Sequence, residues 1–263
     1  MKLFSKFFLV GFFVLSQINF VFSAESLPVE LQEVGLEEHL GNFVSPSIPF
    51  RDEKNQPVLL GDFFDKTHPV ILNLVYFECP NLCGFLLNGL MDSLNKMNWS
   101  VGDQFQMVTV SIDPTEDAPL ASQKKQNYLK AYHRPSAEQG WHFLTGKEAD
   151  IKKLAAEVGF KYKYDEDQKQ YAHGAVIFIL TPEGKISRYL YGIQFNPQDV
   201  KLALLEASKG KIGNLVDRFL MFCYHYDPKG RQYALYAVNM MKIAAALTVI
   251  GIVILVLRLR KKH

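Results

Sequence analysis

Residues 70–97 read VILNLVYFECPNLCGFLLNGLMDSLNKM. The run begins as a mostly apolar, strand-like segment and continues, from Leu82 to about Met97, with a pattern typical of a helix. Two cysteines, Cys79 and Cys83, lie where strand gives way to helix. A helix N-terminus favours the thiolate and lowers the pKa of a thiol, which makes metal ligation and disulfide chemistry accessible at neutral pH. The junction is therefore predicted to be a soft-metal or redox site.

The chain downstream of this junction alternates between strand and helix patterns. Thr181–Gly184 reads TPEG, a strong hairpin-turn signal between two strand-like runs. The order of elements predicts an α/β domain over residues 48–210, with a mixed sheet flanked by helices. Strands are predicted at 70–76, 105–112, 141–144, 175–180 and 186–191, and helices at 82–97, 120–132, 149–158 and 197–208.

Two further polar residues are predicted to join the cysteines at one edge of this sheet. In a sheet with parallel strands, functional groups gather where the strands end and the helices begin. Asp113 follows the second strand and so falls at the same edge as the cysteine pair. His173 precedes the strand at 175–180, which can bring its imidazole back to face Cys79 and Cys83. A lone histidine is more often a core or surface residue, and only this placement favours a ligand.

These pieces resemble the Sco/SenC family of copper metallochaperones, which help to assemble the binuclear copper centre of cytochrome c oxidase. The matching motifs are CPNLC at 79–83, SIDP at 111–114, and His173 ahead of an Ile/Phe-rich strand and a Pro-Glu-Gly turn. Together they cover about residues 42–208. The resemblance implies a thioredoxin-like fold of the peroxiredoxin type.

The resemblance also implies a function and a ligand set. Copper, as Cu(I), Cu(II) or both, would be bound by Cys79, Cys83 and His173. The implied partner is the copper-binding subunit of cytochrome c oxidase, and another copper chaperone is a second candidate partner. Two thiolates and an imidazole suit copper in either oxidation state. A closed structural zinc site would require a fourth protein ligand, which the local sequence does not offer.

Two positions depart from the family pattern. Gly84 stands where many members have proline after the second cysteine, and Ala172 stands where many have an acidic residue before the histidine. The second departure removes a carboxylate that would orient the imidazole. Asp113 and Asp165 are the alternative carboxylates, and the sequence does not choose between them.

Other interpretations of the cysteine pair remain open. The pair could form a structural disulfide, or it could act as the redox-active disulfide of a thiol-disulfide oxidoreductase that reduces the cysteines of the oxidase copper site. Both Cys79 and Cys83 are needed for copper delivery and for thiol exchange, but only copper binding needs His173. A copper donor would not itself be an enzyme.

The two ends of the chain predict export and a membrane anchor. Residues 1–24 have the layout of a secretory signal, and residues 25–47 form an irregular lead-in. After a juxtamembrane segment at 211–235, residues 236–257 are predicted to be a transmembrane helix, followed by the basic tail 258–263. The positive-inside rule places this tail in the cytoplasm. The expected location is the cell inner membrane, with the domain on the periplasmic, exported side.

The charge distribution argues against nucleic-acid binding. All 27 acidic residues but only 22 of the 29 basic residues lie within residues 25–235, so the exported part has a net charge of −5. The chain has three cysteines, which are too few for a disulfide-rich scaffold. The third, Cys223, lies two residues from His225 outside the domain, and the two could form an accessory metal or thiol-exchange site or could simply pack near the membrane.

Overall fold

The computed structural model describes residues 34–78, 82–213, 248, 249, 252 and 258. The described chain divides into two compact units. One consists of the chain up to Leu36 together with Lys161–Gly174, and the other of Glu37–Phe160 together with the chain from Ala175 onward. The predicted signal at 1–24, most of the predicted span at 236–257, Cys223 and His225 lie outside the described residues.

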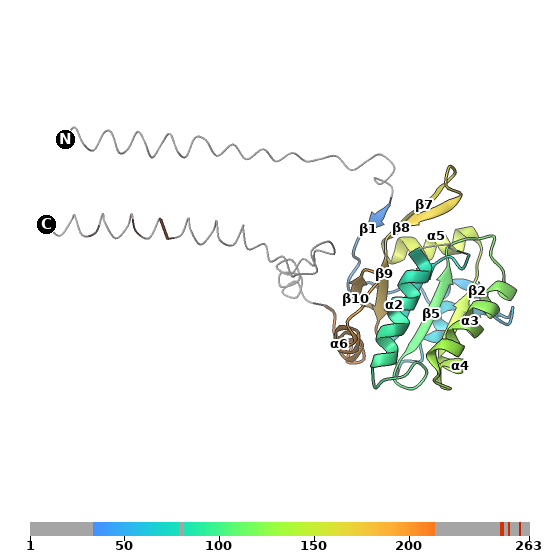
Figure 1. The fold of residues 1–263 in the computed structure, drawn as a ribbon, viewed down its shortest axis with the longest axis horizontal. Coiled ribbons are helices and arrows are strands. Elements are labelled where there is room, and N and C mark those ends of the chain that lie inside the picture. Colours follow the sequence, from blue (N-terminus) through green and yellow to red (C-terminus); the bar gives the residue numbers. More distant parts are fainter. Residues whose placement is uncertain (1–33, 79–81, 214–247, 250–251, 253–257, 259–263) are drawn as a thin grey trace. The chain divides into compact units, whose positions relative to one another are not determined.

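The larger unit contains a five-stranded mixed sheet. Its strand order is β10-β9-β4-β5-β6, and β10, β9 and β5 are labelled in Figure 1. The three strands β4, β5 and β6 are parallel, whereas β9 is antiparallel to β4 and β10 is antiparallel to β9. This arrangement confirms the mixed sheet predicted from the sequence. The strands are β4 (Val70–Val75), β5 (Gln106–Ser111), β6 (Trp141–Leu144), β9 (Val176–Leu180) and β10 (Ile186–Tyr191).

Two helices of the larger unit begin at a residue whose side chain caps them. The Asp117 carboxylate accepts a hydrogen bond from the Leu120 N–H at 3.1 Å, and Asn196 caps the last helix in the same way through the Gln198 N–H at 2.9 Å. The last helix packs against β9, β10 and α2. The helices are α2 (Leu82–Lys96), α3 (Ala118–Tyr132), α4 (Ala137–Gly140), α5 (Glu148–Glu157) and α6 (Pro197–Ala207), with a 3₁₀ turn, η2, at Leu60–Phe63.

Strand β4 lies at the centre of the core. All six of its residues are buried, which is why its sequence is an almost unbroken apolar run rather than an alternating one. The exception is Asn73, whose amide Nδ2 donates to the Thr109 hydroxyl on β5 at 3.4 Å. Thr109 also accepts a hydrogen bond from the Trp141 indole on β6 at 3.0 Å. Three neighbouring strands are therefore linked by side chains as well as by their backbones.

Two hairpins were missed by the sequence analysis. The first pairs β2 (Pro49–Arg51) with β3 (Pro57–Leu59) in the larger unit. The second pairs β7 (Phe160–Asp165) with β8 (Gln170–His173) and forms a three-stranded sheet with β1 (Gly35–Leu36). Strands β2 and β3 have only three residues each, and β7 and β8 carry many polar residues. Neither hairpin therefore shows the apolar periodicity on which strand prediction relies. His173 is thus the last residue of a strand.

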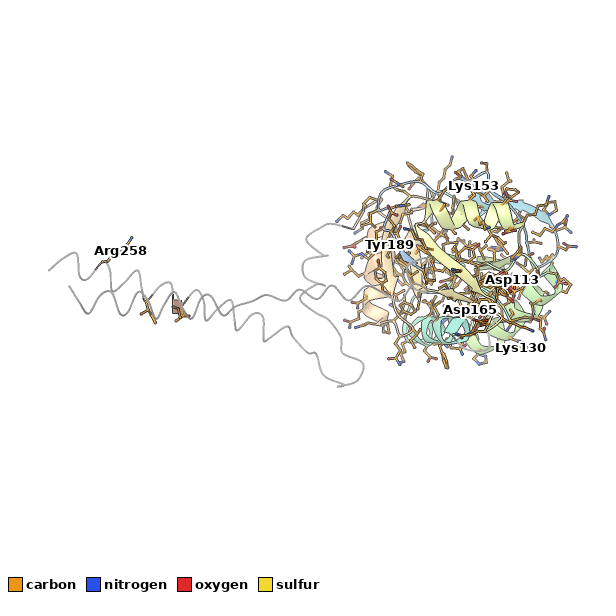
Figure 2. All side chains as sticks on the ribbon, turned by 90° about the horizontal axis from the view of Figure 1, so that it is seen from above. Asp113, Lys130, Lys153, Asp165, Tyr189 and Arg258 are labelled. Atoms are coloured by element: carbon orange, nitrogen blue, oxygen red, sulfur yellow. The ribbon has the colours of Figure 1, made fainter. Side chains whose placement is uncertain are left out.

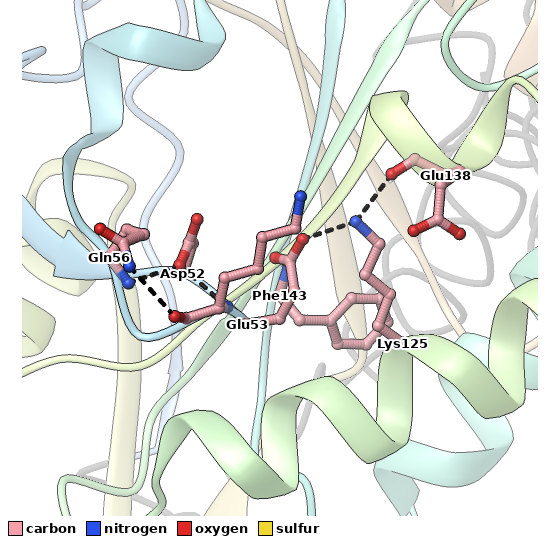
Figure 3. A network of polar contacts seen from close by, with 7 residues as sticks. Asp52, Glu53, Gln56, Lys125, Glu138 and Phe143 are labelled. Carbon is pink, nitrogen blue, oxygen red and sulfur yellow. Dashed lines mark hydrogen bonds and ion pairs between the residues drawn. The ribbon is translucent and has the colours of Figure 1, made fainter.

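A buried ion pair joins the β2–β3 turn to helix α3 (Figure 3). Lys125 Nζ lies 2.6 Å from Glu53 Oε1, and each side chain is only 6% exposed. Lys125 also donates to the Glu138 carbonyl, and the second Glu53 oxygen accepts the Phe143 N–H. Burial alone would raise the pKa of Glu53, but the hydrogen bond and charge of Lys125 outweigh it and hold that pKa below its usual range. Other lysines, such as Lys130, are exposed at the surface (Figure 2).

No helix within the described residues is long and apolar enough to cross a membrane.

Replacing Lys125 with methionine should destabilise the domain by about 3–5 kcal/mol, because it leaves the Glu53 carboxylate buried without its counter-charge. The double variant Glu53→Gln, Lys125→Met should be less destabilised than the single one. Since the folded-state pKa of Glu53 is lowered, the contribution of the pair is present at neutral pH and is lost as pH falls through that lowered pKa. Chemical unfolding followed by circular dichroism measures these differences. Lys130→Met, on the exposed side of α3, is the control and should change stability by less than about 0.5 kcal/mol.

Candidate metal-binding site

The segment that carries the cysteines leaves the sheet at the edge predicted from the sequence. Strands β4 and β5 are parallel and in register, with Val75 paired to Ser111 at their ends. Phe77 and Glu78 follow β4 at this edge, and Asp113 follows β5 there. The residues before Cys79 and the loop containing Asp113 are therefore neighbours, as the sequence indicated.

Cys83 is the second residue of helix α2. Its backbone thus belongs to the first helical turn, where the helix dipole stabilises a nearby anion. The first turn of α2 contains no acidic residue that would oppose a thiolate. Cys79 lies outside the described residues.

Glu116 ties the two strand ends together. Its carboxylate accepts hydrogen bonds from the backbone N–H of Phe77 at 2.8 Å and of Glu78 at 2.7 Å. The Ser111 hydroxyl, at the end of β5, donates a third hydrogen bond at 2.5 Å. Burial raises the pKa of Glu116, although all three hydrogen bonds favour the charged form. This side chain also borders a cavity of about 400 Å³ whose lining includes Arg51 and Lys147.

Asp113, the acidic residue singled out in the sequence, holds its own turn. Its Oδ1 accepts hydrogen bonds from the backbone N–H and the hydroxyl of Thr115, at 2.8 and 2.6 Å. The carboxylate that reaches the segment before Cys79 belongs instead to Glu116, three residues later. The sequence analysis missed Glu116 because an acid inside a turn usually caps that turn or a helix. A backbone contact between residues 39 positions apart has no sequence signal.

His173 is held in the form that a metal requires. Its Nδ1 lies 2.9 Å from the Gly174 carbonyl oxygen. Because a carbonyl can only accept, Nδ1 carries the hydrogen, and a neutral imidazole then has its lone pair on Nε2. The side chain is 7% exposed, and this burial lowers the pKa of His173 despite the hydrogen bond. The imidazole is therefore neutral at neutral pH, which is the ligating form.

The sequence analysis offered Asp113 and Asp165 as alternative partners of the imidazole, and in the structure His173 Nδ1 donates to the Gly174 carbonyl. A backbone carbonyl is one of the usual partners of a metal-binding histidine. Asp165 Oδ1 accepts the backbone N–H groups of Asp167 and Gln168, at 3.0 and 2.9 Å, and so stabilises the turn between β7 and β8.

Three tyrosines share a face of the β7–β8 hairpin with His173. Tyr162 pairs directly with His173, and Tyr164 pairs with Tyr171. Alternate residues of a strand point to the same face, so these two pairs lie on one side of the hairpin. The Tyr171 ring centroid lies 5.8 Å from that of Tyr162 and 5.0 Å from that of Tyr164. The sequence analysis, which did not recognise the hairpin, did not single out this aromatic face.

In the part of the chain that the structure describes, no three side chains of His, Cys, Asp or Glu are grouped so that they could hold a metal ion. The predicted ligand Cys79 lies outside that part. The set of Cys79, Cys83 and His173 therefore stays a prediction.

Comparison with known proteins identifies the family. Residues 49–207, more than half of the chain, match the SCO1/SenC family model. The chain belongs to the SCO1/SenC family. This result confirms the resemblance noted from the CPNLC and SIDP motifs.

Individual relatives are distant in sequence but share the fold. A SCO1 protein homolog from Bacillus subtilis is 25% identical over 132 residues, which cover 49% of this chain and 65% of that protein. Arabidopsis thaliana ScoI, solved with copper bound, is 19% identical, with a TM-score of 0.51 over 64% of this chain and 99% of that one. BsSco, described as a member of the Sco family of cytochrome c oxidase assembly proteins with a disulfide switch, is 19% identical, with a TM-score of 0.52 over 67% and 99% of the two chains. These likenesses confirm the thioredoxin-like, mixed α/β fold.

Proposed function

We propose that this protein is a membrane-tethered copper metallochaperone. It binds copper through Cys79, Cys83 and His173 and delivers it for assembly of the binuclear copper centre of cytochrome c oxidase. The observation that carries the proposal is that β4 and β5 end at the same sheet edge, and that the chain following β4 resumes with helix α2 at Leu82, whose second residue is Cys83. Family membership supports it, and an Arabidopsis structural relative was solved with copper bound.

Chain connectivity supports the inclusion of His173. Strand β9 runs antiparallel to β4, with Ile177 paired to Asn73, so β9 begins at the edge where β4 ends. His173 precedes Val176, the first residue of β9, by three positions. Three residues span at most about 11 Å, which limits how far the Cα of His173 can lie from that of Val176.

The chemistry of the three ligands suits a copper donor. Thiolates favour Cu(I), and imidazole accommodates Cu(II). A site with three protein ligands leaves room for an incoming ligand, so the ion can pass to the partner by ligand exchange. The partner we propose is the copper-binding subunit of the oxidase, and another copper chaperone could supply the ion.

A second candidate is a thiol-disulfide oxidoreductase that reduces the cysteines of the oxidase copper site. The disulfide switch described for BsSco favours keeping this candidate. Here Cys79 and Cys83 would form the redox-active disulfide, with one thiolate attacking and the other resolving the mixed disulfide. His173 would then not be required.

We further propose that the domain lies on the periplasmic side of the inner membrane, anchored by residues 236–257. This proposal rests on the signal-like residues 1–24 and the basic tail 258–263.

His173→Ala should lower the copper affinity of the reduced full chain by at least about tenfold, because loss of an orienting partner alone often costs that much. Competition with a Cu(I) chelator, and direct titration with Cu(II), measure the affinity. His133→Asn is the matched control, since His133 is exposed and asparagine tolerates its left-handed backbone (φ 57°). Unchanged affinity for both ions in His173→Ala would remove this residue from the ligand set. Oxidation of the cysteine pair should abolish binding, because a disulfide offers no thiolate.

Complementation of a deletion strain separates the two candidate functions. If copper delivery is the function, oxidase activity is lost in the deletion strain and His173→Ala fails to restore it, although the cysteine pair is intact. Added copper should partly rescue the deletion by mass action. Full restoration by His173→Ala, combined with failure of Cys79→Ser and Cys83→Ser, would favour the oxidoreductase instead. A Cys223→Ser strain shows whether the third thiol takes part in either mechanism.

A reporter fused after His263 tests the topology. An enzyme that is active only after export should remain inactive there, because the basic tail is expected in the cytoplasm. The same reporter fused after Gly213 should be active. Activity of the fusion at His263 would show that the span or its orientation is wrong.

A further inference from the structure

Glu116 holds the backbone immediately before the first cysteine. Each of its two carboxylate oxygens accepts one backbone hydrogen bond: Oε2 accepts the Phe77 N–H and Oε1 accepts the Glu78 N–H. Strand β4 ends at Val75, so these two N–H groups lie beyond the strand. Two successive backbone donors directed at one carboxylate make a chelate-like contact that fixes the peptide planes on both sides of Phe77.

The carboxylate is itself anchored from the other strand. The Ser111 hydroxyl donates to Oε2 and accepts the Asp113 N–H at 3.1 Å. Phe77 is buried, and its ring centroid lies 5.8 Å from that of Phe143 in the core. Through Glu116, the buried Phe77 beyond the end of β4 is therefore linked to Ser111, the last residue of β5.

We propose that Glu116 is a positioning residue for the copper ligand Cys79. The Cα of Cys79 lies one peptide unit, about 3.8 Å, beyond that of Glu78. A fixed Glu78 backbone restricts where the Cys79 thiolate can lie and reduces the ordering that copper binding requires. This inference rests on the function proposed above, because it assumes that Cys79 binds the metal.

Glutamine cannot replace the carboxylate in this role. A glutamine side chain has one acceptor oxygen, and its amide group would direct N–H donors at one of the backbone N–H groups. At least one of the three hydrogen bonds is then lost. Aspartate keeps both oxygens and the charge but is one methylene shorter, so it should retain part of the contact. Ser111→Ala removes one donor to the carboxylate, together with the acceptor of the Asp113 N–H, and leaves the contacts with Phe77 and Glu78.

Copper titration of the reduced full chain in detergent tests the role of Glu116. We expect Glu116→Gln and Glu116→Ala to lower Cu(I) affinity by about tenfold or more in competition with a Cu(I) chelator, with Glu116→Asp in between. Ser111→Ala should have a smaller effect, and its combination with Glu116→Ala should be no worse than Glu116→Ala alone, because both act through one contact. Glu183→Gln, an exposed acid in the turn between β9 and β10, is the control and should bind like the unmodified protein.

Thermal unfolding of the same proteins distinguishes positioning from simple bracing. If Glu116 only stabilises the fold, its variants unfold at lower temperature but bind Cu(I) within about twofold of the unmodified protein, which would overturn the proposal. Should Glu116→Ala fail to fold, Glu116→Asp and Ser111→Ala are used instead, and Cu(I) affinity within about twofold of the unmodified protein would again overturn the proposal. Cys79→Ser is titrated alongside. If it keeps the affinity of the unmodified protein, the ligand assignment fails and the positioning role falls with it. If it loses copper while the Glu116 variants do not, only the positioning role is refuted.

Discussion

The in-register parallel pairing of β4 with β5 is the constraint on which the rest of the structure depends. Because the two strands run in the same direction and Val75 pairs with Ser111, both chains leave the sheet at the same edge. The segment before the cysteines and the loop after β5 are brought together there, although they are more than 30 residues apart in sequence. Strand β9, antiparallel to β4, begins at that edge. The ends of β4 and β5 and the start of β9 therefore lie at the same edge of the sheet.

A neighbouring pair of strand ends does not by itself hold a loop in place. That function falls to Glu116, which satisfies two backbone N–H groups beyond β4 and the Ser111 hydroxyl at the end of β5. Asp113 is closer to the strand but is occupied by Thr115 in its own turn. The two acids of this loop therefore have different roles. Asp113 stabilises the turn of the loop, and Glu116 connects the loop to the residues that follow β4.

The tautomer and the neutral state of His173 are set by its immediate surroundings. The Gly174 carbonyl fixes the Nδ1 hydrogen of His173, and burial keeps the ring neutral. The residue before the histidine is Ala172, which has no carboxylate that could orient the ring. A carbonyl one residue away orients the ring without adding a negative charge. On the β7–β8 hairpin, His173 shares its face with Tyr162, Tyr164 and Tyr171, so its neighbours on that face are aromatic rather than charged.

The sequence by itself determined the family, the mixed sheet and the edge where the cysteine segment emerges. These conclusions follow from local signals: a buried strand is apolar, TPEG marks a turn, and the CPNLC spacing is specific. The strands it predicted agree with β4, β5, β6, β9 and β10 to within a residue or so at each end. The hairpins β2–β3 and β7–β8, the Lys125–Glu53 pair and the role of Glu116 were decided only by the tertiary structure. The Lys125–Glu53 pair and the Glu116 contacts join polar groups far apart in the chain, and the two hairpins are built from very short or largely polar strands. Hydrophobic periodicity gives little information about either kind of feature.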